Sequence, residues 1–174
     1  MKVVFCGLTG LGNVALKKLI ELKIDILKVY TRKEKGVFPY FNCEDISDLA
    51  NKNNIPVSFD EIEKGTKADL CLVSTYHRKI ELNKYSFKKA VNIHPSYLPF
   101  FRGRDPIYEA IKNKSTFTGV TAFNMTEILD DGQIIIQERI KIEKNDDKAK
   151  LLKKMLPIYE KYTNFIIESL KNLN

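Results

Sequence analysis

Short apolar runs alternate along this chain with segments whose apolar residues recur at helical spacing. Residues 2–6, 24–30 and 69–74 are apolar runs that predict buried strands. Between the first two runs, helical spacing is followed by Val14, Leu16, Leu19, Ile20 and Leu22. This order is typical of a βαβ unit with a right-handed crossover. We therefore predict a three-layer α/β fold with a mostly parallel sheet.

The rest of the chain continues the alternation, with Asp45 as the cap of a short helix. The further elements that we predict are helices at 46–53 and 58–64, strands at 55–57, 91–94, 117–125 and 133–142, a helix from Pro106, and a long helix opened by Asp146 and Asp147. The buried face of the last helix is predicted to hold Leu151, Leu152, Met155, Ile158, Tyr162, Phe165, Ile166 and Leu170. Because no repeat, linker or low-complexity tract interrupts the pattern, we expect residues 1–174 to form a single domain.

Composition and termini indicate a soluble protein. Apolar residues make up 44% of the chain and charged residues 29%, as in ordinary globular domains. No apolar run approaches the roughly 20 residues that span a bilayer, and residues 1–7 do not resemble a signal peptide. We expect a cytoplasmic location and no membrane partner.

The cysteines and the net charge restrict the partners. Cys6, Cys43 and Cys71 are isolated, and with two histidines in the chain they offer no metal-ligand spacing. We expect no metal, and core positions for the cysteines in apolar strands. The formal charge of +7 favours phosphates, nucleotides, polycarboxylates or nucleic acid as partners, although evenly spread lysines equally fit a solvated surface.

A glycine-rich turn, residues 7–12, follows the first strand. Such a turn could hold a phosphate at the helix N-terminus. Its spacing is not GxGxxG, and the second strand ends in Thr31, Arg32 and Lys33 rather than in an acidic residue that would hold a ribose. A turn that needs positive φ is favoured over a dinucleotide site.

The stretch from Val91 to Pro106 carries the polar residues of greatest interest. Strand alternation places Asn92 and His94 on one face and Ile93 on the other. Pro95 then ends the strand, and ligands of open α/β sheets bind at such carboxyl ends. Together with a carboxylate at Asp130, these side chains suit addition of a nucleophile to a carbonyl.

In that reaction Asn92 would donate to the developing oxyanion, His94 would move a proton, and Asp130 would orient His94 or a water. A serine triad is disfavoured because Ser96 follows Pro95, two residues from His94. Spacing alone leaves open a structural alternative, in which Asn92 caps the loop backbone and His94 is a satisfied edge residue. His77, taken alone, fits a solvated loop residue.

Residues 92–99, followed by Arg102-Gly103 and Pro106, resemble the signature loop of the folate-dependent formyltransferase family. Leu129-Asp130-Asp131-Gly132 is similar to the second motif of that family. The family includes the glycinamide ribonucleotide, methionyl-tRNA and amino-sugar N-formyltransferases. The resemblance covers essentially the whole chain and implies a Rossmann-like sheet of the formyltransferase type.

The resemblance also implies transfer of a formyl group from 10-formyltetrahydrofolate to a primary amine, with no covalent enzyme intermediate. The catalytic residues that it implies are Asn92, His94 and Asp130, with Asp131 leaving the register open by one residue. The folate-binding residues that it implies are Tyr76, His77, Arg78, Ile80, Ile128 and Leu129. The substrate-binding residues that we assign with it are Gly10, Ser96, Arg102, Gly103 and Arg104.

The family resemblance leaves several amines open. Glycinamide ribonucleotide enzymes usually carry a Ser/Asn-rich glycine loop for the ribose phosphate, from which residues 7–13 depart. Methionyl-tRNA enzymes usually carry a further C-terminal domain, and residues 102–106 look closer to the tRNA and sugar branches. A small nucleotide-linked amino sugar is therefore our first expectation, with tRNA second. A non-catalytic folate- or nucleotide-binding module, a homodimer, and a separate chain that supplies a substrate-binding domain all stay open.

Overall fold

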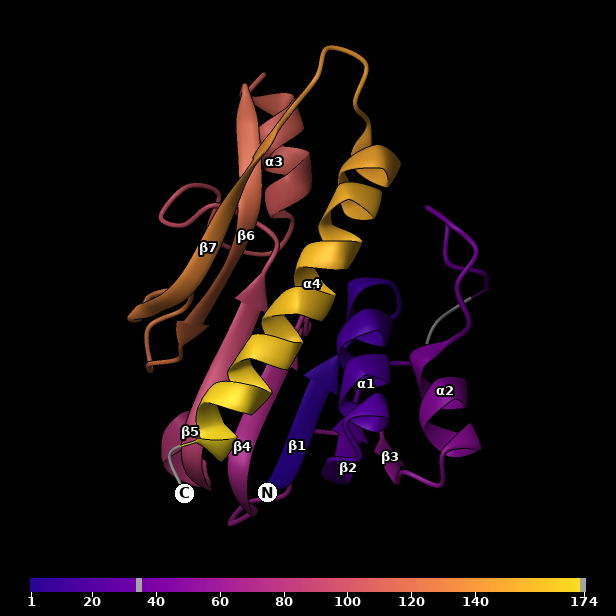
Figure 1. Cartoon of the computed structure of the whole chain (residues 1–174), viewed down its shortest axis with the longest axis vertical. Helices are drawn as coiled ribbons and strands as arrows, with labels where there is room; N and C mark the ends of the chain where they lie inside the picture. The colour runs from indigo at the N-terminus through magenta and orange to yellow at the C-terminus, as the bar shows by residue number, and fades with distance from the viewer. Residues whose placement is uncertain (34–35, 173–174) are drawn as a thin grey trace.

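A mixed sheet of seven strands organises the computed structural model, which describes residues 1–33 and 36–172 (Figure 1). The strands within these residues are β1 (Lys2–Gly7), β2 (Asp25–Tyr30), β3 (Val57–Ser58), β4 (Lys67–Ser74), β5 (Ser86–His94), β6 (Phe117–Asn124) and β7 (Ile134–Lys141). Their order is β3-β2-β1-β4-β5-β6-β7, parallel from β3 to β5 and antiparallel from β5 to β7. The predicted α/β fold with a mostly parallel sheet is confirmed.

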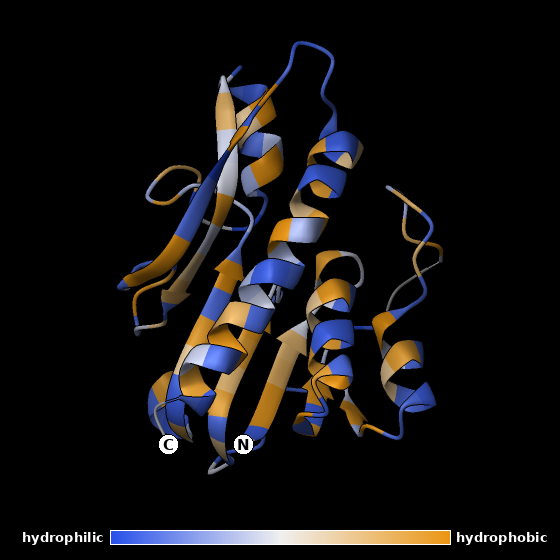
Figure 2. Ribbon diagram, viewed as in Figure 1, coloured by the Kyte–Doolittle hydropathy of each residue, from blue (hydrophilic) through white to orange (hydrophobic). Residues whose placement is uncertain are grey.

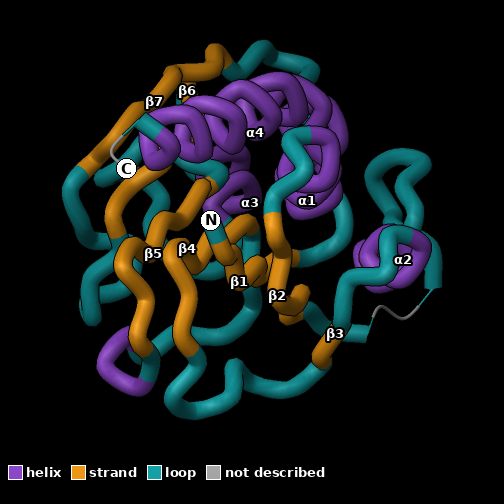
Figure 3. The backbone as a smooth tube through the Cα atoms, turned by 60° about the horizontal axis from the view of Figure 1, so that its bottom comes forward, coloured by secondary structure: helices purple, strands orange, loops and turns teal. Residues whose placement is uncertain are grey.

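Helices cover one face of this sheet (Figure 3). They are α1 (Leu11–Glu21), α2 (Ile46–Lys52), α3 (Pro106–Lys112) and α4 (Lys148–Lys171), and each contributes apolar side chains to one core cluster. As predicted, Asp45 caps α2 by accepting the Ser47 N–H at 2.8 Å, and Asp147 caps α4. Figure 2 shows β1 as apolar along most of its length, whereas α4 alternates apolar and polar residues. The sheet centre is therefore the core.

The buried face of α4 differs from the prediction in both directions. Phe165 is 43% exposed, because it lies beyond the edge of the buried stripe. Tyr159 and Ile167, which the periodicity did not single out, are fully buried instead. The hydroxyl of Tyr159 donates to the carbonyl of Ile93 at 3.0 Å, so that α4 is tied to the end of β5.

Connections rather than helices cover the opposite face of the sheet. The core on this side joins Cys6 and Cys71, as expected for strand cysteines, to Ile62 and Ile80 of two loops. The short 3-10 turn Leu82–Lys84 is the helical element of this layer within the described residues. The third layer is therefore made of loops.

The helix predicted at 58–64 is wrong. This segment forms bends and turns after β3. Ile62 reaches the core, while Glu63 binds the Lys28 ammonium at 2.6 Å and the Tyr30 hydroxyl. These contacts, Lys28 first, lower the pKa of Glu63 to about 2. Contacts to β2 on one side and to the core on the other hold the backbone in a shape that no helix allows.

Two loops meet where the parallel strands end. Val73 pairs with Asn92 across β4 and β5, and His94 pairs with Thr121 of β6. The loops after β4 and β5 therefore leave the sheet side by side.

No helix in the described part of the chain is long and apolar enough to span a membrane.

Candidate active site

A cavity of about 420 Å³ opens at the carboxyl ends of β4 and β5. Its walls come from the loop after β4, the end of β5, the 103–106 segment and the connection that follows β6. The apolar wall residues include Val73, Ile80, Phe123, Met125, Ile128 and Leu129. Its volume lies within the range of about 300–1,000 Å³ of small-molecule sites.

Asn92 and His94 both line this cavity, while Ile93 is fully buried in the helix-side core. The predicted alternation along β5 is therefore confirmed. Within residues 1–33 and 36–172, the Asn92 carboxamide makes no hydrogen bond to protein. The alternative in which Asn92 caps the loop backbone is not supported.

His94 is 6% exposed and has an oxygen near each ring nitrogen. Its Nε2 lies 3.3 Å from the carbonyl of Phe101, and its Nδ1 lies 3.7 Å from Oδ1 of Asp130. Burial lowers the pKa of His94 below 6.5, although the Asp130 carboxylate acts in the opposite direction. The ring is therefore neutral at neutral pH.

Asp130, and not its neighbour, is the carboxylate beside His94. Asp130 is 5% exposed, and its Oδ2 accepts the Gly103 N–H at 2.8 Å. Asp131 turns outward and pairs with Arg102 at 2.8 Å. The backbone of Asp130 has φ of +49°, a left-handed conformation that Asp adopts more readily than most residues.

The six predicted folate-binding residues all line the cavity and come from two loops. Tyr76, His77, Arg78 and Ile80 lie in the loop after β4, and Ile128 and Leu129 lie in the loop after β6. The rings of Tyr76 and His77 meet edge to face at 4.8 Å, and His77 Nε2 accepts the Arg78 Nε–H at 3.1 Å. His77 lies in this loop, as expected, and is half-buried rather than fully solvated.

Of the predicted substrate-binding residues, Gly103 and Arg104 line the cavity and three others do not. Ser96 is fully buried beneath it, with its carbonyl bound by the Thr121 hydroxyl at 2.8 Å. Gly10 lies under the ring of Phe38. Arg102 points outward to Asp131.

Other residues of the cavity were missed. Arg32 and Met125 lie just after the ends of β2 and β6. Their position after predicted strands is the sequence signal that could have identified them as lining residues. Thr75 has φ of +55°, which is strained for a β-branched residue and has no signature in the sequence. Within the described residues, no group of three or more His, Cys, Asp or Glu is placed to hold a metal ion.

Several known proteins are similar to this chain in sequence or in fold. The chain is 30% identical to the methionyl-tRNA formyltransferase of Kosmotoga olearia, in an alignment that covers all of this chain and 59% of that protein. The structure of WlaRD, a sugar 3N-formyl transferase, matches with a TM-score of 0.85 and 23% identity over 99% of this chain and 63% of the other. The phosphoribosylglycinamide formyltransferase of Bacillus halodurans matches with a TM-score of 0.75 and 22% identity, over 99% and 97%.

The chain thus spans about 59% of the length of this curated relative. A family model described as formyl transferase matches residues 21–163, which is most of the chain. The matched range includes the loops after β4, β5 and β6 that line the cavity. The chain belongs to the formyl transferase family.

Proposed function

We propose that this chain transfers a formyl group from 10-formyltetrahydrofolate to a primary amine. The observation that carries the proposal is the buried pair of His94 and Asp130, with Nδ1 and Oδ1 3.7 Å apart, beside Asn92 in one cavity. A neutral imidazole, a carboxylate and a carboxamide are the groups that acyl transfer without a covalent intermediate requires.

The contacts of each side chain support the role that we propose for it. Because a carbonyl can only accept, the contact with Phe101 places the proton of neutral His94 on Nε2. His94 Nδ1 and Asp130 Oδ1 then face each other as two acceptors, and a proton released by the attacking amine has a place between them. Asn92 has its carboxamide available to donate to the carbonyl oxygen as negative charge develops.

The cavity fits the proposed formyl donor. 10-Formyltetrahydrofolate would supply the formyl carbon, which bonds to the amine nitrogen as its bond to N10 of the folate breaks. The proton that the amine loses would pass through the His94–Asp130 pair to N10, which leaves as a secondary amine. Ile128 and Leu129 leave 64% and 57% of their surfaces uncovered beside the cavity, and a flat pterin ring would cover such apolar walls. Arg78 and Lys79, which also line the cavity, suit the carboxylates of its glutamate tail.

A nucleotide-linked amino sugar is the amine that we propose first. Of the described lining residues, four are basic, namely Arg32, Arg78, Lys79 and Arg104. Arg104 makes no hydrogen bond or ion pair with the described part of the chain, so its guanidinium can bind a diphosphate in a bidentate way. The sugar 3N-formyl transferase structure with which the chain shares its fold was solved with dTDP and a formyl-tetrahydrofolate.

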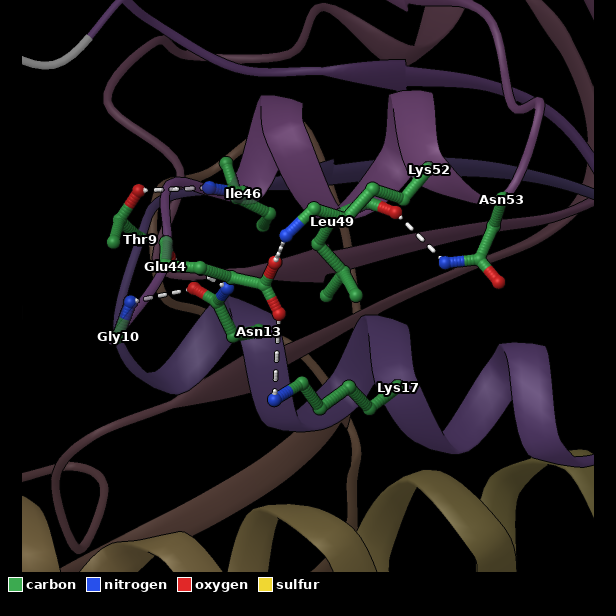
Figure 4. A network of polar contacts seen from close by, with 9 residues as sticks. All are labelled: Thr9, Gly10, Asn13, Lys17, Glu44, Ile46, Leu49, Lys52 and Asn53. Carbon is green, nitrogen blue, oxygen red and sulfur yellow. Dashed lines mark hydrogen bonds and ion pairs between the residues drawn. The ribbon is translucent and has the colours of Figure 1, made fainter. Parts of the chain in front are cut away.

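The glycine turn argues against a ribonucleotide phosphate at the N-terminus of α1. The Gly10 N–H donates to the Asn13 side chain at 2.8 Å, and Asn13 donates to the Glu44 carbonyl at 3.0 Å (Figure 4). Phe38 lies over Gly10 so closely that an added Cβ would stand 2.6 Å from its ring. The place where a helix N-terminus would hold an anion is thus filled by the chain itself.

Methionyl-tRNA is the second candidate, because the sequence relatives carry that name. The +7 formal charge is compatible with tRNA. The affinity for tRNA would fall steeply as salt rises, because contacts with phosphates release counterions. Transfer to a nucleotide-linked sugar would respond to salt only weakly.

Mass spectrometry of reactions with 10-formyltetrahydrofolate and a panel of amines tests the proposal. The panel holds nucleotide-linked 3-amino and 4-amino sugars, glycinamide ribonucleotide and methionyl-tRNA. We expect a formyl mass gain on an amino sugar, lost in Asn92→Ala and kept in Asn51→Ala, a control at an exposed residue of α2. A gain that survives Asn92→Ala would contradict the role of Asn92, and a gain on methionyl-tRNA alone would establish the second candidate.

A further inference from the structure

Three consecutive residues, 101–103, contact the His94–Asp130 pair or its immediate neighbour. The Phe101 carbonyl lies 3.3 Å from His94 Nε2, and the Gly103 N–H donates to Asp130 Oδ2 at 2.8 Å. Between them, Arg102 Nη2 donates to Oδ1 of Asp131 at 2.8 Å. The loop after β5 thus meets the loop after β6 at two adjacent positions of each.

The backbone of this segment has positive φ at two of its three residues, which is strained at Phe101 and easy for Gly103. Phe101 has φ of +56° and Gly103 has φ of +98°. A left-handed phenylalanine is unfavourable, so it persists only where its surroundings determine it. The turn points the carbonyl of residue 101 and the amide of residue 103 at opposite members of the pair. Positioning the pair is a use that would explain the strain.

The Arg102–Asp131 ion pair contributes little to folding by itself. The two side chains are 46% and 45% exposed, and ion pairs this exposed stabilise a fold very little. Asp131 is held from its other side too, because its carbonyl accepts the Thr126 hydroxyl at 2.5 Å. What the ion pair fixes is the distance between two loops, one of which carries Asp130.

We propose that Arg102 and Asp131 form a clasp that positions Asp130 against His94, so that Arg102 is a positioning residue rather than a contact of the amine. The clasp is the Arg102–Asp131 ion pair together with the Gly103–Asp130 hydrogen bond. The proposal rests on the proposed function, since its purpose is to hold the reacting pair. It also replaces the substrate-binding role that the motif suggested for Arg102.

Kinetics of four variants test the clasp, with 10-formyltetrahydrofolate as donor and a dTDP-linked 3-amino sugar as acceptor. Arg102→Ala and Asp131→Ala should each lower kcat about 10- to 100-fold, because displacements near 1 Å cost this much. KM for the amine should change less than threefold. The double variant should be no slower than either single variant, since both remove one interaction. The exchanged pair Arg102→Asp with Asp131→Arg should recover most of the lost kcat.

Glu138→Ala is the matched control. Glu138 pairs with Lys161 at 2.8 Å, is 43% exposed, and lies outside the cavity. Its loss should leave kcat and KM unchanged. The clasp is excluded if Arg102→Ala raises KM while Asp131→Ala changes neither constant, because Arg102 would then contact the substrate directly.

Hydrogen exchange of the Gly103 amide tests the clasp without any reaction. This amide donates to Asp130, so its exchange should accelerate at least tenfold in Arg102→Ala and in Asp131→Ala, and return in the exchanged pair. Unchanged exchange in both single variants would overturn the clasp even in a protein that formylates nothing. Accelerated exchange with no formyl transfer by the unmodified chain would instead reject the proposed function and keep the clasp.

Discussion

His94 shows how one strand position acquires both a fixed proton and a fixed partner. Its Nε2 faces the Phe101 carbonyl, and its Nδ1 faces Asp130. Alternation along β5 predicts its face, and the family motif suggests the carboxylate. No pattern predicts the Phe101 carbonyl or the Gly103 amide, because backbone groups in a positive-φ turn have no side-chain signature. The sequence therefore predicts the candidate catalytic side chains better than the backbone groups that hold them.

Replacement of Asp130 by Asn should remove activity and keep the fold. Asn accepts a left-handed backbone and can still accept the Gly103 N–H, but it has no charge to oppose His94. We expect kcat to fall about 10²- to 10³-fold, which is typical of a lost acid–base group. The free energy of unfolding, measured by circular dichroism, should change by less than about 1 kcal/mol. Asp60→Asn, at an exposed loop residue, is the control, and equal rates in the two variants would contradict the role of Asp130.

Stability should fall as the pH drops below 6.5, in part through His94. Burial lowers the pKa of this residue in the folded protein from 6.5, so the unfolded chain binds more protons in the window below that value. Stability from this group is complete above pH 6.5 and is lost as the pH falls toward the lowered pKa. Thermal melts between about pH 5 and pH 8 should show a steeper acid decline in the unmodified chain than in His94→Asn. Parallel curves would show that His94 titrates normally.

At the scale of elements, long periodic segments are well predicted and contact-determined ones are not. β1, β2 and α4 lie close to their predicted bounds, because each buries a whole apolar run or one face. β5 instead begins at Ser86, before the predicted start at residue 91, because its first half is polar and carries no apolar run. The segment after β3 carries a helical pattern that tertiary contacts of Ile62 and Glu63 override. The prediction that the glycine turn needs positive φ is confirmed at Gly10. No sequence pattern predicts that the ring of Phe38 packs over this glycine.

Substitution of Gly10 should test how tightly Phe38 of the 36–46 segment packs over the glycine turn. Gly10 and Gly65 both have positive φ, +107° and +82°, but only at Gly10 would a Cβ meet other atoms within 4 Å. Gly65→Ala should cost about 1–2 kcal/mol from backbone strain alone. Gly10→Ala should cost a further 1–3 kcal/mol, roughly the range for overpacking, as Phe38 is displaced. Denaturant titrations measure both, and equal costs would mean that Phe38 yields freely.

Across the whole molecule, the two faces of the sheet differ in what they contribute: one carries most of the core and the other carries the cavity. The helix side holds the larger core, whereas the loop side carries the walls of the cavity. Loops with few buried apolar contacts open at lower free energy than core strands. A ligand that fills the cavity should therefore stabilise the loop side most.

Binding of 5-formyltetrahydrofolate should be visible as protection of that side. Hydrogen exchange should slow at residues 76–80 and 126–131 and remain unchanged in β7, the strand at the sheet edge. At about 100 times the Kd, linkage should add about 2.7 kcal/mol to the free energy of unfolding.

Leu129 supplies the discriminating variant for this binding. Leu129→Ser removes an apolar wall that is 57% uncovered, and a loss of about 1.4 kcal/mol of burial would weaken the Kd about tenfold. Phe165→Ser, which alters an apolar residue of α4 that is 43% exposed and lies outside the cavity, should leave the Kd unchanged. If both variants bind as the unmodified chain does, the pterin does not lie against Leu129. If both bind more weakly by the same factor, apolar surface in general and not this cavity holds the ligand, because the two residues share exposure but not position.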